Sequence, residues 1–225
     1  MLVSYNYIVH LANYSDGVLY VLAGLFVIAV AVIIDRMWYL RRAILRGGSI
    51  VRRMAAMGRV NEQDLAALRD FAGRMPEGLL LDTALNHMND ADHAGMNSRM
   101  DEAIMLVAPR LDRRMWVLDT IVTLAPLLGL FGTIIGMFHA FSILATPGHA
   151  PAEVTGGVAD ALVATACGIF IAMIGLATFN MLQNQVRLII HQLETIRTMV
   201  LNRTDGAPVV PHVGGELAVR AVVAA

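Results

Sequence analysis

The sequence predicts an all-α integral membrane protein with three transmembrane helices and long helical cytoplasmic extensions. Hydrophobic residues make up 57% of the 225-residue chain, and its mean hydropathy is +0.61, both high for a soluble domain. The 17 basic residues are all arginines, and none lies before Asp35 or between Met115 and Val186. These arginine-free stretches contain three apolar runs, each long enough for a helix to cross a hydrocarbon core of about 30 Å.

The first predicted span covers residues 18–34, and the charges around it indicate its orientation. Asp16 precedes the apolar run, whereas the arginine-rich stretch 36–42 follows it. A cleaved secretory signal peptide would show the opposite order, with basic residues first. Because cytoplasmic flanks are enriched in basic residues, we expect an uncleaved span with residues 1–17 in the periplasm.

The second and third predicted spans, residues 115–146 and 154–182, are expected to form a hairpin. Arginines lie before the second span and after the third. The turn-rich stretch between the spans, residues 147–153, contains no basic residue and is expected to be a periplasmic loop. This pattern predicts a periplasmic N-terminus and a cytoplasmic C-terminus.

The polar segments are predicted to be helical outside the membrane. Residues 35–114 are expected to form a cytoplasmic helical domain, in which Asn61 and the acidic residues after it begin one helix. The last helix of this domain is expected to run straight into the second span, with Pro109 as the site of a kink. Residues 183–202 should continue the third span as a cytoplasmic helical extension, and residues 203–225 should form a flexible tail.

Small residues crowd the second and third spans. In lipid, small side chains let helix backbones approach closely, and two of the glycines have the spacing typical of such contacts. A proline inside a span removes one backbone hydrogen bond and is expected to kink the helix. The residues to which we assign helix packing and kinking are Pro126, Gly129, Gly132, Gly136 and Gly168.

Two threonines, Thr133 and Thr165, are predicted to lie at similar depth in neighbouring spans. Counting 1.5 Å per residue from the outer ends places them roughly 20 and 15 Å below the outer surface. In an oligomer such hydroxyls could form a polar ring, but each could instead bond back to its own helix. The spacing leaves both interpretations open.

Asp160 is the acidic residue of the third predicted span. A carboxylate within a membrane span costs several kcal/mol unless it is partnered or neutral, and such residues commonly mark ion pathways. Asp160 lies roughly 8 Å from the outer end of its span, where water could reach it. We interpret it as a proton-pathway residue, with an interfacial acid as the alternative.

The sequence lacks the signatures of the common enzyme and metal-binding classes. It contains no glycine-rich phosphate loop, no His-Glu-x-x-His and no Gly-x-Ser-x-Gly motif. The single cysteine, Cys167, excludes an internal disulfide and a cysteine-based zinc site. A net charge of -1 gives no reason to expect nucleic-acid binding. We therefore expect a protein that is not an enzyme, with no cofactor and no catalytic residue.

The stretches Ala125–Met137 and Ala159–Gly168 resemble motifs of the MotA/TolQ/ExbB proton-channel family, most closely its ExbB/TolQ branch. The first matches Ala-Pro-Leu-Leu-Gly-Leu-x-Gly-Thr followed by Gly-Met. The second matches an acid followed by Ala-Leu-x-x-Thr-x-x-Gly, with Asn180 as the asparagine that follows it. The resemblance covers about sixty residues, and the two motifs are specific when they occur together at this spacing.

The resemblance implies a function that composition alone does not. ExbB-like subunits form a ring, typically a pentamer, in the bacterial inner membrane around the single membrane helices of an ExbD- or TolR-like partner. An aspartate of that partner exchanges the translocated protons. The motion drives a TonB- or TolA-like protein in outer-membrane transport or Tol-Pal envelope function. By the same resemblance, Thr133 and Thr165 face the partner's aspartate, and Asp160 is the family's third-span acid.

One residue departs from the family pattern, and several functions share the motifs. Relatives usually carry glutamate where this chain has Asp160, which is one methylene shorter. ExbB, TolQ and gliding-type motor subunits have similar motifs, whereas a MotA-type flagellar subunit is expected to have four spans. A passive membrane scaffold and a self-sufficient ion channel are the alternatives from other functional classes.

Overall fold

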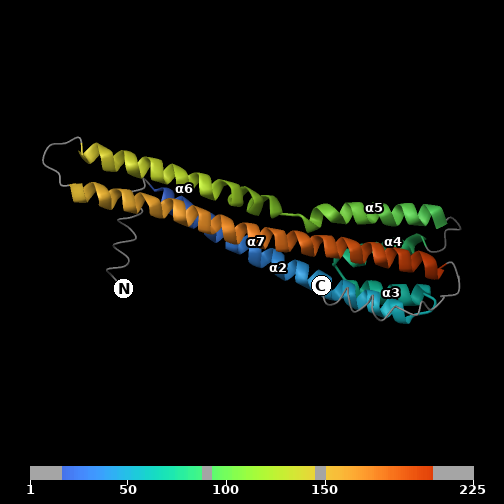
Figure 1. The fold of residues 1–225 in the computed structure, drawn as a ribbon. Helices are drawn as coiled ribbons and strands as arrows, with labels where there is room; N and C mark the ends of the chain where they lie inside the picture. Colours follow the sequence, from blue (N-terminus) through green and yellow to red (C-terminus); the bar gives the residue numbers. More distant parts are fainter. Residues whose placement is uncertain (1–16, 88–92, 145–150, 205–225) are drawn as a thin grey trace, which may run out of the picture. The chain divides into compact units, whose positions relative to one another are not determined.

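The computed structural model describes residues 17–87, 93–144 and 151–204, and within these ranges the chain is helical and contains no strand (Figure 1). This confirms the predicted all-α class. The predicted periplasmic segment before residue 17, the start of the predicted loop and the tail after residue 204 lie outside the described residues. The helices are α2 (Val18–Ala56), α3 (Glu62–Ala72), α4 (Pro76–His87), α5 (His93–Leu111), α6 (Met115–Leu144) and α7 (Pro151–Thr204).

The described residues divide into two compact units, which we call the apolar unit and the polar unit. The apolar unit contains residues 17–36 and 114–181, and the polar unit contains residues 37–113 and 182–204. Helices α2 and α7 are long enough to contribute to both units. The third long apolar helix begins at Pro151, so the last residues of the predicted loop are helical.

Three of the described helices are long and apolar enough to cross a membrane, as the sequence predicts. They are α2, α6 and α7, whose most apolar windows have mean hydropathies of 2.7, 2.1 and 2.2. Large apolar side chains remain exposed on them, including Phe131, Phe138 and Phe170. A helix that is apolar on all sides belongs either in a protein core or in a membrane, and this chain leaves those sides uncovered.

The expectation that the helix preceding the second span would continue into it is wrong. Helix α5 ends at Leu111, and α6 begins at Met115. Pro109 lies inside the last turn of α5, where its ring removes one backbone donor and crowds the preceding turn. Arg114 then adopts a positive φ of 69°, a left-handed conformation that a helix cannot contain. The chain therefore breaks here instead of kinking.

An ion-pair cluster joins α2 to the start of α6 at one end of the apolar unit. The guanidinium of Arg114 donates to the Asp35 carboxylate at 3.0 Å, and Nε of Arg36 lies 3.3 Å from the same oxygen. Arg114 and Asp35 are both about half exposed, so the pair contributes no more than about 1 kcal/mol to stability. It marks where the apolar parts of these helices end.

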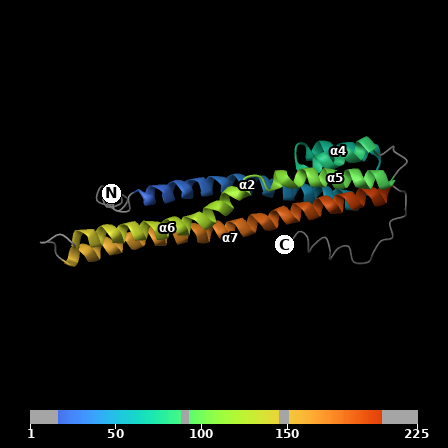
Figure 2. The same cartoon turned by 90° about the horizontal axis from the view of Figure 1, so that it is seen from above.

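The polar unit has its own hydrophobic core. As predicted, α3 starts after Asn61, whose backbone N–H donates to the Asp64 carboxylate at 3.2 Å. Helix α4 packs against both α3 and α5. Figure 2 shows α4 beside α5. The fully buried large side chains of this core come from α2, α3, α4, α5 and α7; they include Leu40, Ile50, Met54, Leu65, Leu80, Leu81, Met100 and Ile189.

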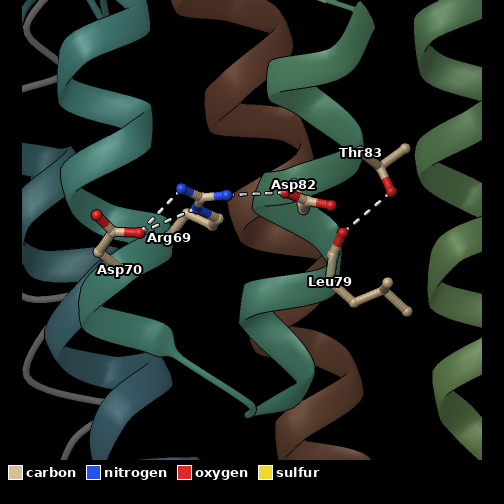
Figure 3. A network of polar contacts seen from close by, with 5 residues as sticks. All are labelled: Arg69, Asp70, Leu79, Asp82 and Thr83. Carbon is tan, nitrogen blue, oxygen red and sulfur yellow. Dashed lines mark hydrogen bonds and ion pairs between the residues drawn. The ribbon is translucent and has the colours of Figure 1, made fainter.

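Arg69 links α3 to α4 on the outside of that core. Figure 3 shows its guanidinium between two carboxylates, Asp70 on α3 at 3.0 Å and Asp82 on α4 at 3.2 Å. Thr83, one residue further along α4, donates its hydroxyl to the Leu79 carbonyl at 3.0 Å (Figure 3). The charge of Arg69 is therefore already matched by its acidic neighbours.

Candidate functional site: the contact between α6 and α7

In the apolar unit, α6 and α7 meet backbone to backbone at two glycines, and the helices lie side by side there (Figures 1 and 2). A methyl group at Gly168 would lie 2.4 Å from the Ala125 carbonyl oxygen. One at Gly129 would lie 2.7 Å from the Ala164 carbonyl oxygen. Side-chain carbons do not approach oxygen this closely, so each position accepts only glycine without movement of the backbone.

Two further glycines of α6 extend this contact. A methyl group at Gly136 would lie 2.6 Å from Cβ of Ala161, and one at Gly132 would lie 2.9 Å from Cβ of Ala164. Gly132 also faces Val18 of α2, whose Cγ1 would lie 3.1 Å from the added carbon. All three apolar helices thus meet at Gly132, and we call this contact of small residues on α6 and α7 the glycine seam.

Pro126 lies inside α6, which continues through it from Met115 to Leu144. Proline has no N–H, so the carbonyl of Val122 lacks its usual helical donor. The side chain of Val122 lies against Gly175 of α7, where a methyl group would come within 2.7 Å of it. The kink that the sequence predicts at Pro126 stays a prediction.

Thr133 is a buried residue of the seam, with only 4% of its surface exposed. Its hydroxyl donates to the Leu130 carbonyl of its own helix at 2.6 Å. Of the two interpretations left open by the sequence, Thr133 shows the bond to its own helix within one copy of the chain.

Thr165 behaves differently, because its hydroxyl bonds to the neighbouring helix. It donates to the Gly129 carbonyl of α6 at 3.0 Å, and its side chain is only half-buried. Gly129 and Thr133 are one helical turn apart, so both hydroxyls belong to the same level of the seam. Whether they line a pore in an assembly stays a prediction.

Asp160 lies on the same stretch of α7, next to the Ala161 that contacts Gly136. It is half-buried in one copy of the chain. The structure thus places all the predicted site residues on α6 and α7 and brings the glycines and threonines together in one contact. The proton-pathway role of Asp160 stays a prediction.

Sequence reasoning missed three parts of the molecule. Gly175 packs as closely on α6 as the predicted glycines do, but it lies outside the recognised motif. The Asp35–Arg114 pair joins residues far apart in the chain, which no local pattern reveals. Glu77 is completely buried in the polar unit. Its spacing from Leu80, Leu81 and Ala84, which form one helical face, was a signal that could have identified it.

The fold and the seam define a class of protein. This is an all-α membrane protein with three long apolar helices, two of which are joined by a seam of glycine and alanine that carries threonine hydroxyls. In the described part of the chain, histidine, cysteine, aspartate and glutamate side chains form no group suited to a metal ion. The chain belongs to the MotA/TolQ/ExbB proton channel family, whose model matches residues 72–195.

Individual relatives point to the same branch of the family. The chain is 30% identical to the biopolymer transport protein ExbB-like 3 of Synechocystis, over 72% of this chain and 79% of the relative. It is 34% identical to the biopolymer transport protein ExbB of Neisseria gonorrhoeae, over 43% and 46%. It is 39% identical to the Tol-Pal system protein TolQ of Haemophilus influenzae, over 35% of each chain. The last two matches span less than half the length of those relatives.

Proposed function

We propose that this chain is the ring-forming subunit of an inner-membrane motor driven by the proton-motive force. Its copies, five in the simplest case, would surround the membrane helices of an ExbD- or TolR-like single-span partner. Proton passage would move the partner against the ring and drive a TonB- or TolA-like protein. The similarity to both ExbB and TolQ proteins supports this branch, for either TonB-dependent transport or Tol-Pal envelope function.

The observation that carries the proposal is the bond between Thr165 and the Gly129 carbonyl. It occurs where the backbones of α6 and α7 are in close contact, so the seam holds a hydroxyl at a defined position inside the apolar unit. The large apolar side chains exposed on the other faces, such as Leu127 and Phe170, suit contact with lipid or with further copies of the chain. A pair of helices joined in this way can serve as a rigid wall element of a ring.

In this function the chain provides surroundings for a proton carrier that belongs to the partner. A hydroxyl has one hydrogen and two lone pairs, so with its hydrogen on the Gly129 carbonyl Thr165 can accept from the partner's protonated acid, and by exchanging that bond it can donate to the ionised carboxylate. Donation to the charged form lowers the free energy of ionisation in an apolar site. Thr165 would perform this role. Thr133 lies on α6, one helical turn beyond the Gly129 that Thr165 contacts, and Asp160 would hold a proton nearer the outer surface.

The orientation proposed for the chain follows from its arginines. They flank the polar ends of the apolar helices and are missing from the apolar stretches, which favours a cytoplasmic polar unit. In that orientation the N-terminus and the connection between α6 and α7 would lie in the periplasm. A multi-pass protein of the inner membrane is the expected arrangement.

We expect this chain to form a complex with an ExbD- or TolR-like protein from the same genome. The two proteins should be co-expressed, purified together in mild detergent and weighed by native mass spectrometry. The expected mass is that of a ring of identical copies, five by the family resemblance, with one or more partner chains. A passive scaffold would instead purify as a ring or monomer that retains no partner.

A second measurement separates the branches of the family. Deletion of the gene should abolish energy-dependent uptake through outer-membrane receptors if the chain serves a TonB-like protein. It should instead weaken the cell envelope, with leakage of periplasmic proteins, if the chain serves a TolA-like protein. A self-sufficient channel would carry protons in vesicles that contain this chain alone, which would contradict the need for a partner.

A further inference from the structure

Glu77 occupies an unusual position for an acidic residue. It lies in the first turn of α4 and is 0% exposed. It shares a helical face with Leu80, Leu81 and Ala84, each of which is also buried. An ionised carboxylate in such surroundings is costly unless it is paired or hydrogen-bonded. Neither carboxylate oxygen of Glu77 accepts a hydrogen bond of good geometry, although the backbone N–H of Glu77 lies close enough to act on the carboxylate.

A second orphaned acceptor lies near Glu77, on another helix. Gln192 of α7 is 4% exposed, and its Oε1 atom has no donor. Its Nε2 atom donates to the Ile44 carbonyl of α2 at 3.4 Å. That bond favours this orientation of the amide, because turning it over would place Oε1 against the Ile44 carbonyl oxygen. Gln192 therefore presents an acceptor to the carboxyl group and not a donor.

Gly47 of α2 makes the space in which these acceptors meet. A methyl group there would lie 2.6 Å from Oε1 of Gln192 and 2.7 Å from Oε1 of Glu77. Both oxygens thus border the same small space beside one glycine. Three helices converge at this point: α2, α4 and α7.

We propose that Glu77, Gln192 and Gly47 form a buried proton-binding site in the polar unit, in which the protonated Glu77 carboxyl donates to Oε1 of Gln192. The bound proton supplies the hydrogen that both acceptors lack. It links α4 to α7, while Nε2 of Gln192 links α7 to α2. The ligand of the site is the proton itself, and ionisation would leave two acceptors facing each other without a donor.

The charged groups around the site leave this assignment intact. Arg46 of α2 acts on Glu77, but its guanidinium also donates to the Ala72 carbonyl at 3.5 Å. Arg69 of α3 is paired with Asp70 and Asp82, and α7 contributes the neutral Gln192. Arg110 of α5 lines a separate pocket of about 540 Å³ with Arg69 and Asp82, and Glu77 does not line that pocket.

Electrostatics agree with the geometry. Burial raises the pKa of Glu77 from 4.5 to about 7, and the nearby backbone N–H of Glu77 and the Arg46 guanidinium lower it by less. In the orientation proposed above, the site would titrate near neutral pH in the compartment that receives the protons. That consequence rests on the proposed function, whereas the proton site itself does not.

The test compares Glu77→Gln with Glu102→Gln in the full-length protein in detergent. Glu102 is an exposed glutamate of α5 in the same unit, so it provides a matched control. At pH 6 the infrared spectrum of the wild-type protein should contain the carbonyl stretch of a protonated carboxyl. We expect the variant-minus-wild-type difference spectrum to show a negative carbonyl band for Glu77→Gln and no such band for Glu102→Gln, because any absorption from Asp160 is common to all three proteins and cancels. A spectrum in which Glu77→Gln removes only carboxylate absorption would overturn the proposal.

The same variants give a second readout through hydrogen exchange of the α4 amides. The folded state holds the proton more tightly than the unfolded state, so stability is complete below about pH 4.5 and falls until about pH 7. After correction for intrinsic exchange, the opening constant of α4 should rise on the order of a hundredfold from pH 4.5 to pH 8. The rise should persist in Glu102→Gln and nearly vanish in Glu77→Gln. An equal rise in both variants would contradict the site.

Discussion

Replacing Gly168 by alanine is expected to destabilise the apolar unit strongly. The added methyl group would lie 2.4 Å from the Ala125 carbonyl oxygen and 3.1 Å from the Gly129 Cα. These are backbone atoms of α6, so no side chain can rotate away and the helices must separate. Overpacking of this kind costs typically 1–3 kcal/mol, and we expect a loss of about 3 kcal/mol because the contact is with backbone.

The matched control is Gly24→Ala, in the first apolar helix. A methyl group at Gly24 meets no atom within 4 Å in one copy of the chain. Thermal unfolding in detergent and the amount of folded protein in membranes should both fall for Gly168→Ala and stay close to wild type for Gly24→Ala. Equal stability of the two variants would show that α6 and α7 are not packed as closely as the seam requires.

The second large effect is expected from Thr165→Val, which keeps the shape of the side chain and removes the hydroxyl. The lost bond to the Gly129 carbonyl should cost only about 0.6 kcal/mol of stability, as is typical of hydrogen bonds between membrane helices. Without the hydroxyl, the partner's acid loses a hydrogen-bonding group, and the activation free energy of proton transfer should rise by about 1–3 kcal/mol. That corresponds to a proton flux roughly fivefold to 150-fold lower.

Two other substitutions separate the loss of the hydroxyl from a change of packing. Thr165→Ser keeps the hydroxyl and should retain most of the flux. Thr178→Val removes a hydroxyl that bonds to its own helix, at 2.8 Å from the Ile174 carbonyl, and should leave the flux unchanged. The rate is measured as acidification of vesicles that contain the chain and its partner. If Thr165→Val carries protons as fast as wild type, the site assignment is wrong.

The membrane part of the fold could be predicted because its determinants are local. Three apolar runs and the distribution of arginines are enough to predict three spans. Glycines such as Gly129 and Gly136 can be recognised by their spacing before their contacts are known. The actual partner atoms, such as the Ala125 carbonyl facing Gly168, depend on the register between α6 and α7 and therefore needed the structure.

The polar unit was harder to predict, because competing local signals are decided by tertiary packing. Pro109 indicated a kink, but the positive φ of Arg114 ends the helical path between α5 and α6. Glu77 follows Pro76 in a first helical turn, where an exposed acid is usually favoured by the helix dipole. Burial against α2 and α7 overrides that preference, and the sequence contains little beyond the spacing of Leu80 and Leu81 to reveal it.

The central claim is that the glycine seam faces a passage occupied by the partner's acid. Disulfide crosslinking to the partner tests this claim most directly. The native cysteine, half-buried Cys167, is first replaced by alanine so that no competing thiol remains. Thr165→Cys is then combined with a cysteine in place of the acidic residue in the partner's membrane span. We predict an efficient disulfide between the two chains, and none with Gly24→Cys on the first apolar helix. A crosslink that forms only with Gly24→Cys, or with neither position, would contradict the account.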